Sequence, residues 1–216
     1  QNDTRLLSNL ASVLQLQGKY NQAVEFLQKA VILEPTNAEL HWNLGIALLT
    51  TGDFKQGWQE YEWRSSILNS DISKGKFKSP KWDGQPLGNK KILFLYSEQG
   101  CGDAIQFVRY VNLIEKNSGR IIVQCQPALK ILFQSINIID QVITTKDKIP
   151  AFDFHAPLMS LPSIFDTSID TTFRLHLIVL YQILGAHIHS PLDKCYSKYA
   201  CLAKTLDPKC REFVEY

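Results

Sequence analysis

The turn Ser97-Glu-Gln-Gly-Cys-Gly-Asp103 holds the residue types of this chain that are best suited to chemistry. Glycines beside a helix N-terminus usually expose backbone amides to a phosphate. Here the turn ends in Asp103, and its carboxylate would compete with a phosphate for the same donors. Two interpretations stay open. In the first, the Asp103 carboxylate caps the helix. In the second, it faces a crevice and takes a proton from a substrate hydroxyl. The two roles can coexist if one carboxylate oxygen caps the helix and the other faces the crevice.

Cysteine chemistry and metal binding are not indicated. Cys101 lies beside the same helix N-terminus, but the adjacent Asp103 opposes a thiolate and the motif contains no histidine. The chain has five cysteines without a CxxC pair, so it predicts neither a zinc site nor a disulfide framework. We therefore expect reduced thiols, a cytoplasmic protein, and no metal or cofactor.

The elements around the turn predict an open α/β sheet. Residues 91–97 have the pattern of a strand and residues 103–117 that of a helix, which places the turn at the carboxyl end of a strand. Strand signals at 120–125, 141–144 and 152–155 then alternate with helix signals at 127–135 and 157–165. This alternation predicts a parallel sheet that is covered on both faces.

The first 71 residues contain an internal repeat with a period of 34. The shared positions are two turn glycines, two small helix-contact residues in each unit and several large apolar residues, as in the pairs Gly18/Gly52, Ala11/Gly45, Ala23/Gly57, Leu10/Leu44 and Leu14/Leu48. Period, spacing and the closing Pro35 resemble the tetratricopeptide repeat. The second unit departs from the pattern because Arg64 stands at a small-residue position. Its aromatic second helix is expected to pack against the following domain.

Composition limits the classes of partner. A net charge of +2, with 45% hydrophobic and 20% charged residues, describes a globular chain and does not indicate nucleic-acid binding. The most apolar run, residues 175–184, is too short to span a membrane. Residues 70–90 have the composition of a linker, in which Trp82 and Leu87 are expected to anchor the segment.

Two longer motifs carry a resemblance to a known family. Residues 80–87 followed by 92–110, and then residues 152–162, look like the join in bacterial tetratricopeptide proteins with a glycosyltransferase-like C-terminal region. That region resembles the heptosyltransferases, whose two facing Rossmann-like lobes form the GT-B arrangement. The expected fold class is thus α + α/β. Its parts are repeats at 1–69, a linker at 70–90, a Rossmann-like lobe at 91–170 and an atypical tail at 171–216.

The resemblance also implies roles for individual residues. In such relatives a Gly-Asp pair at the first strand–helix turn supplies the base that deprotonates the acceptor sugar, which would assign this role to Asp103. Glu98, Gln99, Gly100 and Gly102 would shape the acceptor side. His155, at the end of a later strand, is a further candidate for the crevice wall, or else a surface or core histidine.

The pattern stops near residue 170, where a second lobe for the nucleotide sugar would begin. Residues 171–216 show no strand–helix alternation and no glycine-rich turn for a diphosphate, so we expect a truncation or frameshift there. The chain is then the acceptor-side lobe of an inverting glycosyltransferase and inactive on its own. The alternative is a non-enzymatic module that binds a protein or peptide in the groove of its repeats.

Overall fold

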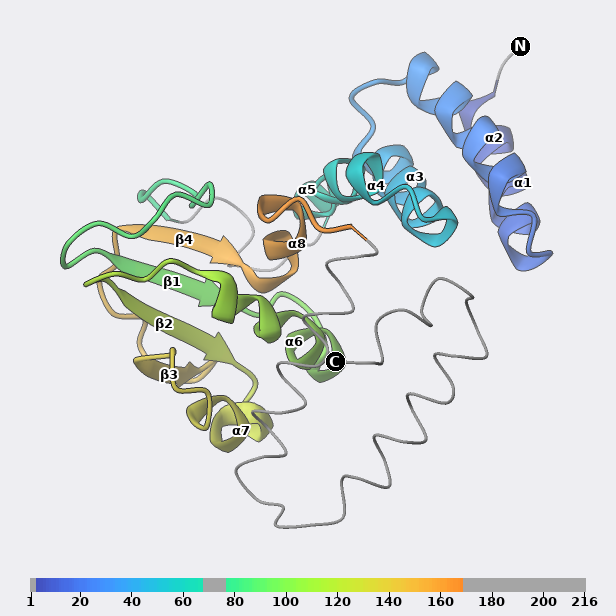
Figure 1. The fold of residues 1–216 in the computed structure, drawn as a ribbon. Helices are drawn as coiled ribbons and strands as arrows, with labels where there is room; N and C mark the ends of the chain where they lie inside the picture. The colour runs from blue at the N-terminus through green and yellow to red at the C-terminus, as the bar shows by residue number, and fades with distance from the viewer. Residues whose placement is uncertain (1–2, 68–76, 169–216) are drawn as a thin grey trace, which may run out of the picture.

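The computed structural model describes residues 3–67 and 77–168, which form helical hairpins followed by a parallel sheet with helices (Figure 1). This architecture confirms the expected α + α/β class. The N-terminal helices are α1 (Thr4–Leu16), α2 (Tyr20–Leu33), α3 (Ala38–Thr51), α4 (Phe54–Tyr61) and α5 (Arg64–Ile67). The tail at 171–216 and its expected truncation lie outside the described residues.

The helical hairpins form as the repeat predicts. Gly18 and Gly52 occupy the turns with φ of +74° and +89°, a region that residues with a Cβ rarely adopt. Asn37 caps α3 because its Oδ1 accepts hydrogen bonds from the amides of Glu39 and Leu40. Such a cap stabilises a helix by about 1 kcal/mol. Between the helices lies a core of small and large apolar residues, Ala11, Leu14, Ala23, Leu27, Leu44, Ala47 and Leu48.

In the second hairpin, α3 and α4 approach each other so closely that position 45 has room only for glycine. A Cβ placed on Gly45 would lie 2.6 Å from the backbone nitrogen of Tyr61. Real Cβ atoms do not approach that closely, so α3 and α4 are in contact through their backbones. This contact fixes Tyr61 at the end of the second hairpin.

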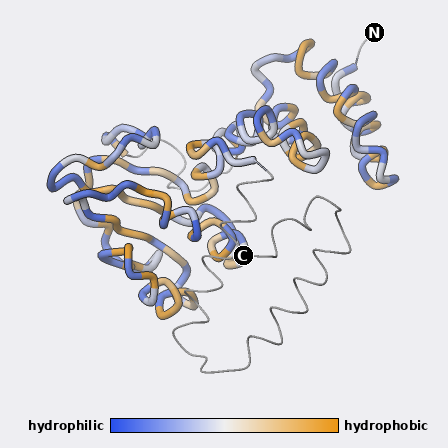
Figure 2. The backbone as a smooth tube through the Cα atoms, in the orientation of Figure 1, coloured by the Kyte–Doolittle hydropathy of each residue, from blue (hydrophilic) through white to orange (hydrophobic). Residues whose placement is uncertain are grey.

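The sheet contains four parallel strands in the order β3-β2-β1-β4. They are β1 (Ile92–Tyr96), β2 (Arg120–Cys125), β3 (Gln141–Thr144) and β4 (Phe154–Pro157). Hydrophobic residues run along the central strands in Figure 2. Their alternate side chains point to opposite faces, so Leu93 and Leu95 enter one core while Phe94 and Tyr96 enter another.

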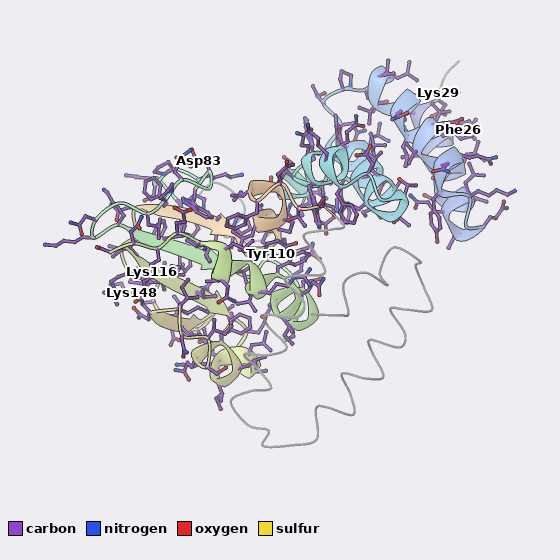
Figure 3. The ribbon with its side chains drawn as sticks, viewed as in Figure 1. Phe26, Lys29, Asp83, Tyr110, Lys116 and Lys148 are labelled. Atoms are coloured by element: carbon purple, nitrogen blue, oxygen red, sulfur yellow. The ribbon has the colours of Figure 1, made fainter. Side chains whose placement is uncertain are left out.

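The helices of the described lobe pack on one face of the sheet. This face carries α6 (Cys101–Val108), the 3₁₀ helix η1 (Arg109–Leu113) and α7 (Lys130–Gln134), with Tyr110 inside the packed region (Figure 3). The second face is covered by Phe77, Ile149 and Phe152, which come from the linker and a loop. Burial on both faces was expected, but among the described residues only one face has helical cover.

Several element boundaries differ from the sequence prediction. The helix expected at 103–117 begins at Cys101, changes to a 3₁₀ helix at Arg109 and ends at Leu113. The segments at 127–135 and 157–165 each divide into a 3₁₀ turn followed by a short α-helix. In the second segment these are η3 (Leu158–Ser160) and α8 (Leu161–Ile164). The fourth strand begins at Phe154 rather than 152, and just before it the Asp153 carboxylate accepts a hydrogen bond from the amide of Ile92.

The described part of the linker continues the sheet beside β4. Trp82 donates its amide to the carbonyl oxygen of His155, and His155 donates its own amide to Pro80. Trp82 and Leu87 are 4% and 1% exposed, which confirms both as anchors. The second-hairpin residues Trp58 and Tyr61 pack against the same core, as expected for a helix that meets the next domain.

Candidate functional site

The Ser97–Asp103 turn lies at the topological switch point of the sheet. From β1 the chain proceeds to β2 and β3 on one side, and then crosses to β4 on the other side of β1. In open α/β sheets the crevice outside the strand carboxyl ends at such a point is the usual place for a ligand. The turn follows β1 directly and leads into α6, so the topology places it at this position.

Asp103 is the third residue of α6, not its N-cap. Gly100 holds the cap position, and its amide donates a 3.2 Å hydrogen bond to Oδ2 of Asp103. The carboxylate thereby stabilises the positive end of the helix dipole. The side chain is half-buried, between the buried Ala104 and the exposed Gly102. The geometry therefore commits one carboxylate oxygen to the cap.

The glycines of the turn leave room beside the carboxylate. Gly100 and Gly102 are exposed, and their φ values lie outside the left-handed region. A Cβ on Gly102 would meet nothing within 4 Å, and one on Gly100 would make only an ordinary contact with Asp103. Neither turn conformation nor packing in the described structure requires glycine at position 102. A ligand that approaches the backbone closely is one reason for a glycine in such a place.

Glu98 is held by a buried ion pair with the second hairpin. Its Oε2 accepts hydrogen bonds from Arg64, at 2.8 Å from Nη2 and 3.2 Å from Nε. The Arg64 side chain is fully buried and that of Glu98 is 1% exposed. Burial alone would lower the pKa of the Arg64 guanidinium, but the carboxylates of Glu62 and Glu98 outweigh it and raise that pKa.

The same guanidinium joins three parts of the chain. Arg64 Nη1 donates to Oε1 of Glu62 at 2.8 Å, and Nη2 also donates to the hydroxyl of Ser160, which in turn donates to Glu62. These residues come from the helical repeats, the β1 turn and the 3₁₀ turn after β4. The Oε1 atom of Glu98 is buried and has no hydrogen-bond partner within the described segments.

Tyr61 brings the second hairpin next to the turn. Burial raises the pKa of its phenol, and the Asp103 carboxylate acts in the same direction, while Arg64 and hydrogen bonding with Gln99 oppose them. Gln99 is fixed from the other side, since its carbonyl oxygen accepts a 2.5 Å hydrogen bond from the Gln126 side chain. An aromatic hydroxyl from the repeats therefore borders the residues of the turn.

The structure does not bring His155 to this turn. His155 pairs with Phe94 in the register of β1 and β4, and Phe94 points away from the face that carries α6. The imidazole is 7% exposed, and its ring centroid lies 4.9 Å from that of Phe77. Burial, with the charge of Lys81 as a second cause, lowers its pKa. This environment is that of a core histidine.

Three residues of the site were missed by sequence reasoning about the turn, namely Arg64, Tyr61 and Ser160. Arg64 had left a signal, because it stands at the position that Ala30 occupies in the first repeat. A large cation at a small-residue position indicates that the repeat meets something other than another repeat. Nothing in the sequence near Ser160 indicated its contact with Arg64.

A small cavity borders Ser160 and Glu62. Its volume is about 110 Å³, and Glu62, Lys81, Trp82 and Ser160 are among its lining residues. Within the described segments, no group of three or more His, Cys, Asp or Glu residues could hold a metal ion. Cys101 is exposed and Cys125 is buried, and both are free thiols. No helix in residues 3–67 or 77–168 is long and apolar enough to cross a membrane.

Comparison with known proteins supports the repeat. A family model described as TPR repeat matches residues 11–52, which span the turn glycines of both units. This part of the chain is a tetratricopeptide repeat, as its 34-residue period predicts. The match ends before Arg64, where the second unit departs from the pattern.

Two longer proteins are similar to parts of the chain. Protein FlbA of Caulobacter vibrioides is 37% identical over 60 residues, which are 28% of this chain and 10% of that protein. A solved structure of a Thermobaculum terrenum O-GlcNAc transferase mutant gives a TM-score of 0.30 at 16% identity, over 65% of this chain and 34% of that one. The chain thus spans a minor part of the length of both.

Proposed function

We propose that the α/β lobe is the acceptor-side lobe of an inverting glycosyltransferase and that Asp103 is its general base. The observation that supports this proposal most is the position of a half-buried carboxylate at the switch point of a parallel sheet. A nucleotide-phosphate site is the alternative for such a corner, but the charge of Asp103 beside the first amides of α6 disfavours it.

The proposed reaction needs one proton transfer at this corner. The acceptor hydroxyl gives its proton to the Asp103 oxygen that does not cap α6. The acceptor oxygen then attacks the anomeric carbon of a nucleotide sugar from the face opposite the leaving diphosphate, which inverts the configuration. General-base catalysis of this kind typically contributes a factor of about 10² to 10⁴.

The neighbouring residues have positioning roles in this proposal. The Arg64–Glu98 ion pair holds the start of the turn, and Gln126 holds Gln99. The exposed Gly100 and Gly102 leave space for the acceptor. His155 is not part of the proposed site, since its side chain lies on the opposite face of the sheet.

The described lobe would supply one wall of the active site. Among the described residues there is one Rossmann-like sheet, and the resemblance assigns the nucleotide sugar to a second lobe. We therefore propose repeats at 1–69, a linker at 70–90 and the lobe at 91–170, in a cytoplasmic protein that binds an acceptor sugar and alone is inactive or nearly so. A heptosyltransferase-like acceptor is the finer form of this proposal.

The experiment is a titration of the full chain, labelled with nitrogen-15, with a panel of mono- and oligosaccharides. The largest amide shifts are expected at Gly100, Gly102 and Asp103. Asp103→Asn keeps an oxygen for the helix cap, so binding and fold should persist, whereas any turnover with nucleotide sugars should fall at least about a hundredfold. Asp83→Asn, in the exposed linker (Figure 3), is the matched control. Shifts confined to the repeats, or unchanged turnover in Asp103→Asn, would contradict the proposal.

A second candidate function is protein binding through the repeats alone, with an inert lobe. The TPR match at residues 11–52 favours it, because such repeats commonly bind proteins or peptides. The two functions separate in one comparison. Partner capture that is insensitive to Asp103→Asn, together with the absence of saccharide binding at the turn, would favour the interaction module.

A further inference from the structure

Tyr61, the last residue of α4, is held in place from several sides. The absence of a Cβ at Gly45 lets the backbone of α3 approach the backbone of Tyr61. The guanidinium carbon of Arg64 lies 5.0 Å from the centroid of the Tyr61 ring, and the ring of Trp58 meets it edge-on at 6.0 Å between centroids. Arg64 Nη1 also donates a 3.2 Å hydrogen bond to the carbonyl oxygen of Tyr61. Backbone and ring contacts together fix where this side chain lies.

Two contacts define how the end of the second hairpin lies against the turn and α6. The ring of Trp58 meets that of Phe107 edge-on, at 6.1 Å between centroids. Arg64 Nη2 donates a 2.8 Å hydrogen bond to Glu98 Oε2. Tyr61 is separated by three residues from both Trp58 and Arg64, a spacing that places helical side chains on one side. Tyr61 therefore lies between the two contacts, beside the segment 98–107.

That segment contains the proposed base, Asp103. Burial is the main cause that raises the pKa of the Tyr61 phenol, and the Asp103 charge adds to it, so the phenol keeps its proton at neutral pH. Hydrogen bonding with Gln99 lowers the same pKa, as expected when the Gln99 amide donates to the phenol oxygen. The phenol proton is then available to an oxygen of a ligand. Tyr61 and Asp103 are both half-buried, so each keeps a surface that a ligand can reach.

The packing contacts of Tyr61 do not explain its hydroxyl. At the repeat offset of 34 residues, Tyr61 corresponds to Leu27, which is 1% exposed in the core of the first hairpin. The position thus requires a large apolar side chain. A phenylalanine would keep the edge-on contact with Trp58 and the contact of the ring face with the Arg64 cation. The hydroxyl adds a polar group on the side of the turn.

We infer that the Tyr61 hydroxyl is part of the acceptor site and donates a hydrogen bond to a sugar oxygen other than the one that Asp103 deprotonates. This inference rests on the proposed function of the lobe. It makes the second hairpin a wall of the acceptor site, so the repeats contact the same sugar that the lobe activates. The acceptor is then a sugar that presents at least two oxygens to the site. A deoxy sugar that lacks the second oxygen should bind less tightly.

The test titrates the full chain, labelled with nitrogen-15, with the methyl glycosides of glucose, galactose and mannose, and then with the monodeoxy analogues of the tightest binder. Tyr61→Phe should weaken binding of that sugar by about three- to tenfold, the usual effect of one uncharged hydrogen bond, with the urea midpoint unchanged. One monodeoxy analogue should lose the same factor with the parent chain and lose nothing further with Tyr61→Phe. Tyr20→Phe removes a hydroxyl from a tyrosine that is 40% exposed on α2, and this matched control should bind like the parent.

The outcomes separate this inference from the proposed function. If amide shifts appear at residues 97–103 and Tyr61→Phe binds as tightly as the parent, the role of Tyr61 is refuted while the proposed function stands. If Tyr61→Phe weakens binding of every analogue by the same factor, the hydroxyl acts only on the structure of the turn, and the direct contact is refuted. The absence of shifts at that turn in the parent chain would refute the proposed function, and the inference with it.

Discussion

Replacing Arg64 with methionine should destabilise the chain far more than removal of any surface cation. The substitution keeps an unbranched apolar side chain in the space and removes the guanidinium. Glu98, at 1% side-chain exposure, then keeps a carboxylate without its ionic partner. Glu62 loses the same partner but is 33% exposed, so water can replace the contact. The cost should therefore arise mainly at Glu98.

The magnitude follows from that burial. Breaking a buried ion pair by removing one partner costs about 3–5 kcal/mol, whereas an exposed pair contributes about 0.2–1 kcal/mol. A domain of ordinary stability has about 5–15 kcal/mol in total. Arg64→Met should thus remove at least about a fifth of the free energy of unfolding. The double variant Arg64→Met/Glu98→Gln should recover most of the loss, because no buried charge remains.

The assay is urea unfolding at pH 7, followed by tryptophan fluorescence and circular dichroism. The matched control is Lys91→Met, whose ammonium lies 2.8 Å from Asp153 in a pair with side chains 49% and 33% exposed. A loss for Arg64→Met no larger than that for Lys91→Met would refute the reasoning. So would a double variant that is no more stable than Arg64→Met.

Three further predictions follow from the packing. Gly45→Ala should cost about 1–3 kcal/mol in the same assay, because its Cβ would lie 2.6 Å from the backbone of Tyr61; wild-type stability would show that α3 and α4 can separate without cost. Gly102→Ala should leave stability unchanged or raise it by up to about 1 kcal/mol, since nothing lies within 4 Å of the new carbon. The same variant should weaken acceptor binding if a ligand uses that space, and unaltered binding would contradict this use. For His155, burial holds the folded pKa below the ordinary 6.5, so its contribution is present above that pH and is lost as the pH falls. The urea midpoint of the parent chain should therefore fall more between pH 7.5 and pH 5 than that of His155→Phe, and equal falls would exclude His155 as the cause.

Much of the fold could be predicted because its signals are local. The strands at 120–125 and 141–144 match their predicted bounds, since each is a short apolar run between turn residues. The turn glycines of the repeat were equally clear, because a positive φ leaves few alternatives. The helix ends were harder to predict. The change at Arg109 from α to 3₁₀ geometry occurs within Phe107–Val111, a stretch without the glycine or proline that would signal it in the sequence.

Only the part of the site that is contiguous in the sequence could be predicted. Glu98 to Asp103 lie together because they are neighbours in the chain, and the strand–turn–helix pattern places them at a strand end. His155 was expected near them because it lies at the end of a later strand. However, strand side chains alternate between the two faces of the sheet. The pairing of His155 with Phe94 places its side chain on the face that lies away from α6. That register is a long-range pairing of β4 with β1, which the residues of β4 alone do not reveal.

Arg64 shows how a departure from a repeat can be informative. In the first unit the equivalent Ala30 is fully buried within the helical array. In the second unit the array ends, and the same position faces Glu98 and Ser160 of the lobe. A small side chain would leave a gap there, and an apolar one would leave Glu98 unpaired. The guanidinium fills the space and supplies donors to both partners. The orientation of the repeats relative to Asp103 is therefore held by directional hydrogen bonds in addition to the packing of Trp58 and Tyr61 on the lobe core. If Asp103 acts on an acceptor, the repeats would form part of the frame that holds its turn in place.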